Sequence, residues 1–260
     1  MSRTVHDAPP FFDTPPGQLV REWASARLDA AVEGVLGDCA LQIGLPSLDA
    51  LRANRMPEHW LLGDERLLDS GDSVREDLRC VVAAPEALPF ANQVFDLVVL
   101  PHSLDFSEHP QEVLAEAVRV LAPEGRLIVL GFNPLGPWWF RQQFVRFGCK
   151  SYLPPETNPI GILRLKDWLS LLGLRITEGA FGVWRPARRT RSALRRWAWL
   201  EKAGDRWFPQ CSNLYLLSAV KKIPGRTPPA VLPFADTLSA LAGKAGKKAV
   251  PRPMSSKIET

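Results

Sequence analysis

Two continuously apolar stretches with an amphipathic segment between them limit the fold more than any other feature of this chain. Residues 95–100 and 126–132 each contain one charged residue, Asp96 and Arg126, and are otherwise as continuously hydrophobic as strands that are covered on both faces. Between them, residues 110–121 carry apolar side chains at helical spacing, and residues 123–125 (Pro-Glu-Gly) end that helix. A strand, a helix and a strand in so few residues form a right-handed crossover between parallel strands. With a further apolar strand at 79–83, the sequence predicts an α/β fold.

Several short motifs occur in order along this stretch. They are Leu88-Pro89-Phe90, then Phe95-Asp96, then Glu116-x-x-Arg119-Val120-Leu121 followed by Pro123-Glu124-Gly125. The ordered set resembles the second half of the type 11 branch of the class I S-adenosylmethionine-dependent methyltransferases. Any buried strand–helix–strand unit would share the apolar runs, but not the ordered motifs. The resemblance covers residues 18–222 and is densest in the middle.

The resemblance implies a Rossmann-like class I methyltransferase fold, with a seven-stranded, mostly parallel sheet and helices on both faces. Its last two strands, expected at 174–181 and 213–220, would form a reversed hairpin at the sheet edge. S-adenosyl-L-methionine would be the cofactor and methyl transfer the reaction.

Composition sets wider limits. The chain has 260 residues, of which 46% are hydrophobic and 23% charged, so it can bury the core of one soluble α/β domain. A formal charge of +4 permits an acidic partner without demanding one. The four cysteines form no C-x-x-C pair and the four histidines show no zinc-binding spacing, so we expect buried, reduced thiols and no metal. No signal peptide or bilayer-length apolar stretch is visible, and we expect a cytoplasmic protein.

Three regions are expected along the chain. Residues 1–17 are proline-rich and are predicted to be a flexible N-terminal segment. The resemblance implies a methyltransferase-like domain over residues 18–222, and its expected elements are helices at 18–36, 47–54 and 164–172 and strands at 39–44 and 59–63. Residues 223–260 are rich in Pro, Ala and Lys and are predicted to be a basic, disordered tail.

The turn after the first strand is the expected cofactor site, because ligands of open parallel sheets bind beyond the carboxyl ends of the strands. The resemblance implies an acid and then G-x-G-x-G at this position. Here Gln42 stands in place of the acid, and Gly44 is the single glycine of the three, followed by Leu45-Pro46. Gln42 can still form hydrogen bonds but brings no charge. The alternative is that Gly44 only ends a strand.

Further candidates for cofactor binding follow the next strands. Asp64 lies 20 residues after Gly44, near the interval at which nucleotide-binding folds place a carboxylate for the ribose hydroxyls; the alternative is a solvated turn residue. The resemblance implies an acid near the adenine four residues before the Leu-Pro-Phe motif. The chain has Ala84 there, followed by Pro85 and Glu86, and Glu86 is near enough to substitute.

Pro101 and His102 end the fourth strand, where the resemblance places residues that face the sulfonium and the acceptor. An imidazole titrates near neutral pH, so His102 is the candidate general base. A lone histidine at a strand end is more often structural. The aromatic segment after the fifth strand includes Trp138 and Trp139, which would form a lid over a flat or apolar acceptor, or pack as core.

One strongly basic run, residues 185–199, interleaves cations with tryptophans. An anionic partner, either nucleic acid or a membrane surface, could bind to this run. Its contacts would be the side chains of Arg188, Arg189, Arg191, Arg195 and Arg196. The alternative is a solvated helix face.

Two functions remain open at this point. The first is an S-adenosylmethionine-dependent methyltransferase acting on a small or apolar acceptor. The second is a catalytically inactive methyltransferase-like protein that binds a partner through residues 185–199, which the departures at Gln42, Leu45, Pro46 and Ala84 suggest. A nicotinamide dehydrogenase is a weak third, because no G-x-G-x-x-G follows the first strand.

Overall fold

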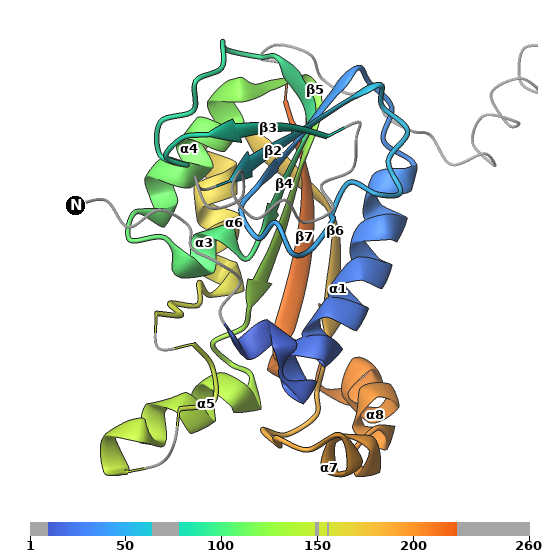
Figure 1. Ribbon diagram of the computed structural model, residues 1–260, viewed down its shortest axis with the longest axis vertical. Coiled ribbons are helices and arrows are strands. Elements are labelled where there is room, and N and C mark those ends of the chain that lie inside the picture. Colours follow the sequence, from blue (N-terminus) through green and yellow to red (C-terminus); the bar gives the residue numbers. More distant parts are fainter. Residues whose placement is uncertain (1–9, 64–77, 149–150, 155, 223–260) are drawn as a thin grey trace, which may run out of the picture. The chain divides into compact units, whose positions relative to one another are not determined.

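The computed structural model describes residues 10–63, 78–148, 151–154 and 156–222. The chain separates into a compact unit, Met1–Ile223, and a second unit, Pro224–Thr260. The tail predicted to be disordered, residues 223–260, lies outside the described residues. Within the compact unit the described strands form a single sheet (Figure 1).

The sheet confirms the predicted class I methyltransferase fold. In the described part of the chain it has seven strands in the order β3-β2-β1-β4-β5-β7-β6. These are β1 (Cys39–Ile43), β2 (Glu58–Gly63), β3 (Leu78–Val82), β4 (Phe95–Pro101), β5 (Leu121–Phe132), β6 (Leu174–Gly182) and β7 (Leu214–Lys221). β1 to β5 pair in parallel, whereas β7 is antiparallel to both β5 and β6, which is the expected reversed hairpin.

Helices cover both faces of the sheet, α1 on one face and α4 and α6 on the other (Figure 1). The α-helices are α1 (Pro15–Glu33), α3 (Ser103–Phe106), α4 (Pro110–Val120), α5 (Pro137–Gln143), α6 (Ile162–Leu171), α7 (Arg191–Arg196) and α8 (Trp199–Trp207), and the 3-10 helices are η1 (Pro10–Asp13), η2 (Phe144–Phe147) and η3 (Pro209–Cys211). Alternate residues of β4 show why two cores form: Leu97 and Val99 face the α1 side, and Val98 and Leu100 face α4.

The start of the domain lies earlier than the sequence predicts. Residues 10–17 were expected to be loose, but η1 and the first turn of α1 occupy them. The side chain of Thr14 accepts a hydrogen bond from Gly17 N–H as the N-cap, and two prolines follow it in the first turn. Phe11 and Phe12 are buried in the α1-side core, so burial of two large rings orders this segment.

Two smaller expectations are also wrong. Residues 47–54 form turns rather than a helix. Cys211 is an exposed free thiol rather than a buried one. Cys39 and Cys80 lie in strands as expected but are only half-buried, and Cys149 lies outside the described residues.

The sequence motifs hold the frame of the domain. Arg119 of α4 donates hydrogen bonds to the carbonyl oxygens of Leu88 at 3.0 Å and Phe90 at 2.9 Å, and it pairs with Glu116 at 2.8 Å. Glu116 in turn accepts the N–H of Leu88 at 3.0 Å. The E-x-x-R pair therefore holds the Leu-Pro-Phe turn against α4, so these motif residues stabilise the domain.

Candidate functional site

The turn after β1 is organised by the side chain of Gln42, which is buried. Its Nε2 donates toward three backbone carbonyl oxygens at 2.8–3.1 Å, those of Gly44, Leu45 and Leu48. Its Oε1 accepts the N–H of Ala50 at 2.9 Å. The amide is thus fully engaged with residues 44–50, which explains both the need for a donor here and the turn structure in place of the predicted helix.

The same turn crosses the edge where a cofactor is expected. Gly44 has φ +79° and Leu45 φ +43°, so the chain reverses through two left-handed residues. A small hollow beside it is lined by Ile43, Gly44, Pro46, Leu62, Gly63, Ala83 and Pro85. Its volume is about 10 Å³, which is room for about one water molecule. The predicted residues Gly44 and Pro85 therefore meet at the carboxyl ends of β1, β2 and β3, but in this conformation the described residues do not fit a nucleoside.

The other predicted cofactor residues divide into three groups. Ala84 is half-buried next to Pro85, immediately beside the hollow but not in its lining. Glu86 accepts a hydrogen bond from the Ser107 hydroxyl at 3.2 Å, so it lies near α3. Asp64 lies outside the described residues.

The end of β4 is tied to the end of β1. The Ser103 hydroxyl donates a hydrogen bond to the carbonyl oxygen of Ile43. Pro101 and His102, which precede it, are buried, and His102 has φ +58°. The structure thus brings the two predicted regions, residues 42–44 and 101–102, to one edge of the sheet.

His102 forms a buried pair that the sequence analysis missed. Its Nδ1 lies 2.8 Å from Oδ2 of Asp105, and both side chains have no exposed surface. The same Oδ2 accepts the backbone N–H of Phe132 at 2.9 Å. Burial raises the pKa of Asp105, while the hydrogen bond from His102 opposes that rise. Nδ1 is therefore the ring nitrogen that faces Asp105, and Nε2 is the one that does not.

Two atoms of this pair lack partners. His102 Nε2 and Asp105 Oδ1 are buried without a hydrogen-bond partner among the described residues. Aromatic rings surround the imidazole, with ring centres at 4.4 Å for Phe132, 5.8 Å for Phe12 and 6.5 Å for Phe106. Unpaired buried polar atoms are costly, which makes this pair a candidate for ligand binding or catalysis. One of these three rings, that of Phe12, comes from η1, so this element also packs against the imidazole.

The two predicted lid tryptophans differ in their surroundings. Trp138 is 1% exposed, and its indole N–H donates to the carbonyl oxygen of Arg185 at 2.7 Å. Its ring packs edge-on against Phe11 and Tyr152. Trp138 is therefore a core residue in this structure, as the alternative interpretation had it. Trp139 is half-buried against the same core, and a lid role for it stays a prediction.

The basic run forms a separate cluster of helices. Residues 185–190 lead into α7, and α8 follows, so the five arginines proposed for an anionic partner lie together and are exposed. Arg189 donates to the carbonyl oxygen of Ser151, and Arg191 to the side chain of Gln18. Trp138, Arg141 and Tyr152 bond to backbone carbonyls of residues 185–188, which fastens the start of the run to the domain.

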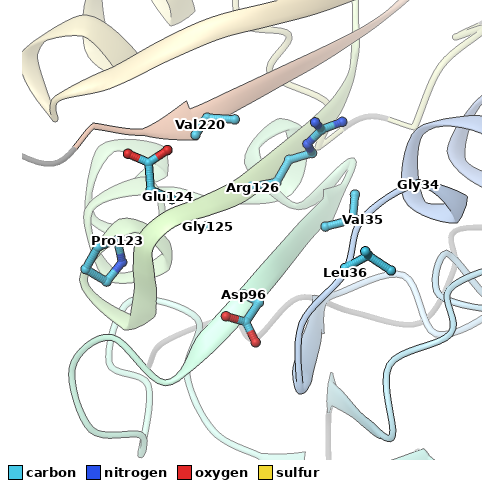
Figure 2. Close-up of a pocket in the computed structure, with 9 residues that line it drawn as sticks. All are labelled: Gly34, Val35, Leu36, Asp96, Pro123, Glu124, Gly125, Arg126 and Val220. Atoms are coloured by element: carbon cyan, nitrogen blue, oxygen red, sulfur yellow. The ribbon is translucent and has the colours of Figure 1, made fainter. Parts of the chain in front are cut away.

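A larger hollow of about 300 Å³ lies at the opposite ends of the strands, where β4 and β5 begin (Figure 2). Asp96 and Arg126 contribute side chains to it, and Asp96 also accepts hydrogen bonds from the N–H groups of Asp38 and Cys39. Open parallel sheets bind ligands at the carboxyl ends of their strands, so this hollow is not the candidate site. In the described part of the chain, no three His, Cys, Asp or Glu side chains are grouped to hold a metal ion.

Comparison with known proteins supports the family resemblance and the fold. Residues 63–129 match the family model described as a methyltransferase domain. The uncharacterized protein YafS of Escherichia coli K12 is 35% identical over 100 residues, which cover 38% of this chain and 41% of YafS. The ubiquinone/menaquinone biosynthesis C-methyltransferase UbiE of Stutzerimonas stutzeri is 40% identical over 105 residues, which cover 39% of this chain and 40% of UbiE. The chain therefore spans less than half the length of these curated relatives.

Solved structures resemble a much larger part of the chain. A chain from the complex of the Haloferax volcanii Trm112 methyltransferase activator covers 82% of this chain and 95% of its own length, with a TM-score of 0.57 at 17% identity. The YcgJ protein of Bacillus subtilis covers 78% and 99%, with a TM-score of 0.55 at 15% identity. The fold is that of the class I S-adenosylmethionine-dependent methyltransferases. Together with the family match, this confirms the resemblance to their type 11 branch.

Proposed function

We propose that this protein is an S-adenosylmethionine-dependent methyltransferase with a small, apolar acceptor. One observation carries the proposal: the buried His102–Asp105 pair, with Nε2 unpaired, lies at the carboxyl end of β4 and is tied through Ser103 to the turn that follows β1. The family match over residues 63–129 and the methyltransferase relatives support it.

In this proposal His102 is the general base and Asp105 its positioning residue. Asp105 holds the proton on Nδ1, so Nε2 is free to take a proton from an acceptor. The surrounding phenylalanine rings suit a flat, apolar acceptor. The UbiE relatives are named for C-methylation in quinone biosynthesis, which makes a ring carbon of a quinol the acceptor that we infer first.

Cofactor binding requires the turn at residues 44–47 to open, because the described hollow holds about one water molecule. Gly44, Pro85, Ala84 and Pro101 would then line the ligand, and Asp64 is the proposed ribose partner. S-adenosylmethionine would supply an activated methyl group, while the chain would orient the acceptor and exclude water.

Calorimetric titration with S-adenosylmethionine and S-adenosylhomocysteine tests this proposal. Ala83 lines the hollow, and its neighbour Val82 is 38% exposed and absent from the lining. We expect binding to the native protein and to Val82→Trp, and none to Ala83→Trp. His102→Gln should bind the cofactor but lose methyl transfer to a reduced quinone. If the native protein gave no binding heat with either ligand, the proposed methyltransferase activity would be refuted.

That result would favour the second candidate, a methyltransferase-like protein that has lost its cofactor. The specific observation behind it is the full engagement of Gln42, whose side chain has both its donors and its acceptor directed at the turn. The solved structure of the [4+2]-cyclase SpnF, with a TM-score of 0.53, shows that a chain named for other chemistry shares this fold.

A further inference from the structure

The helices α7 and α8 concentrate positive charge. Residues 185–208 contain eight cations and two carboxylates, so their formal net charge of +6 exceeds the +4 of the whole chain. Arg188, Arg195 and Arg196 are exposed, and within the described residues none of the three pairs with a carboxylate. Glu201 pairs instead with Arg185 at 3.0 Å. The three unpaired guanidinium groups are therefore available to an anionic partner.

Large rings are exposed beside these cations. Trp199 is 60% exposed, Trp207 70% and Phe208 65%. The buried residue of α8 is Gly204, where an added Cβ would come within 2.2 Å of the Trp184 ring. Close contact at Gly204 therefore fastens α8 by one side and leaves the tryptophans at its two ends outside the core. They stand eight residues apart, or about 12 Å along the helix axis.

We propose that the α7–α8 surface, formed by Arg188, Arg195, Arg196, Trp199, Trp207 and Phe208, docks on an anionic lipid bilayer. The rings would enter the headgroup region, where indoles are favoured, and the arginines would contact lipid phosphates. In the described part of the chain no helix is long and apolar enough to cross a membrane, so the contact is peripheral. This inference does not depend on the proposed methyl transfer.

A bilayer fits this surface better than a nucleic acid does. Proteins that bind single strands combine a basic groove with stacked rings along it. Here the exposed rings stand at the ends of a helix that contacts the domain through Gly204, Glu201 and the carbonyl oxygen of Phe208. α8 follows β6 and lies at the same end of the sheet as α5, where Phe140 is 67% exposed (Figure 1). Docking would therefore turn the end of the sheet that carries His102 toward the lipid.

Sedimentation of the full chain with sucrose-loaded vesicles tests the proposal. Vesicles of equal parts phosphatidylglycerol and phosphatidylcholine are compared with phosphatidylcholine alone. Arg195→Ala with Arg196→Ala should weaken binding to the anionic vesicles roughly 30-fold, because each cation near such a surface contributes about 1 kcal/mol. Trp199→Ser with Trp207→Ser should weaken it at least about tenfold through lost apolar burial. The tail is the same in every variant.

The matched controls lie on α6. Leu163 and Leu171 are 78% and 85% exposed there, so Leu163→Ser with Leu171→Ser, and Arg164→Ala with Lys166→Ala, should leave binding unchanged. In the native protein, tryptophan emission should shift to the blue on anionic vesicles and be quenched by brominated lipid. No sedimentation with anionic vesicles, or equal losses in the α6 controls, would overturn the proposal. The proposal would also be overturned if the arginine variant lost binding to an RNA oligonucleotide while the tryptophan variant bound vesicles as well as the native protein.

Discussion

Replacing Gln42 by glutamate should unfold the turn after β1 rather than restore a cofactor site. The variant is nearly isosteric and supplies the acid that the family resemblance implies. Its carboxylate, however, would face the carbonyl oxygens of Gly44, Leu45 and Leu48, toward which Nε2 now donates at 2.8–3.1 Å. Two amide hydrogens are lost and like partial charges are brought together, whereas the bond from Ala50 N–H survives.

The cost follows from the groups left unpaired. A buried acceptor without a donor costs about 1–3 kcal/mol, and two amide hydrogens are lost, so Gln42→Glu should lower the free energy of unfolding by about 4 kcal/mol. For a domain of this size that corresponds to a melting temperature lower by roughly 8–16 °C. Burial and the carbonyl dipoles should raise the pKa of the new carboxyl, so the deficit should shrink as the pH falls and the group gains a proton that it can donate.

Thermal and urea unfolding measure this effect across the pH range. Gln111 is exposed in the first turn of α4, so Gln111→Glu is the control and should change stability by less than about 0.5 kcal/mol. If Gln42→Glu were as stable as the native protein at neutral pH, the amide would not be holding the turn. If it also gained affinity for S-adenosylmethionine, the reasoning from Gln42 would be refuted outright.

Three further perturbations follow from the structure. Arg119→Ala removes the donors that hold the carbonyl oxygen of Leu88 and its turn, and urea unfolding should show a loss of roughly 2–3 kcal/mol; an unchanged midpoint would contradict the clamp. Arg119 also lowers the pKa of Glu116, so the stability that Glu116 contributes is present at neutral pH and lost in acid. The difference between native protein and Glu116→Gln should therefore shrink as the pH falls, and a constant difference would argue against it. Phe12→Ala should leave a cavity beside the imidazole at a cost of about 3–5 kcal/mol and make His102 reactive to diethylpyrocarbonate, whereas equal labelling of the native protein would show that Phe12 does not shield it.

The sequence was informative where burial dominates. The strands β1, β2 and β4 lie within a residue or two of their predicted bounds, because strands covered on both faces need unbroken apolar runs. The helix α4 was equally clear from its apolar spacing. Expectations failed where a side chain competes with the regular backbone pattern. The predicted helix at 47–54 is replaced by turns whose carbonyl and N–H groups bond to Gln42.

The candidate site was only half visible in the sequence. His102 could be found from its place after an apolar strand, but Asp105 could not be assigned to it without the short helix α3, which sets the two side chains three residues apart in contact. Phe12 contacts His102 because η1 packs against the sheet, and a contact between such distant parts of the chain cannot be read from local sequence patterns. A threonine followed by two prolines at residue 14 was an available signal for the earlier start of α1.

The clamp between Glu116, Arg119 and the Leu-Pro-Phe turn bears on how a family name should be passed from one chain to another. These residues make the match recognisable, yet their bonds serve the mechanical integrity of the domain. Lineages that exchange one reaction for another can keep them intact. Orthologues of this chain are therefore better grouped by activity from residues 42–48 and 102–105, where the sequence can change with the reaction while the family motifs stay the same.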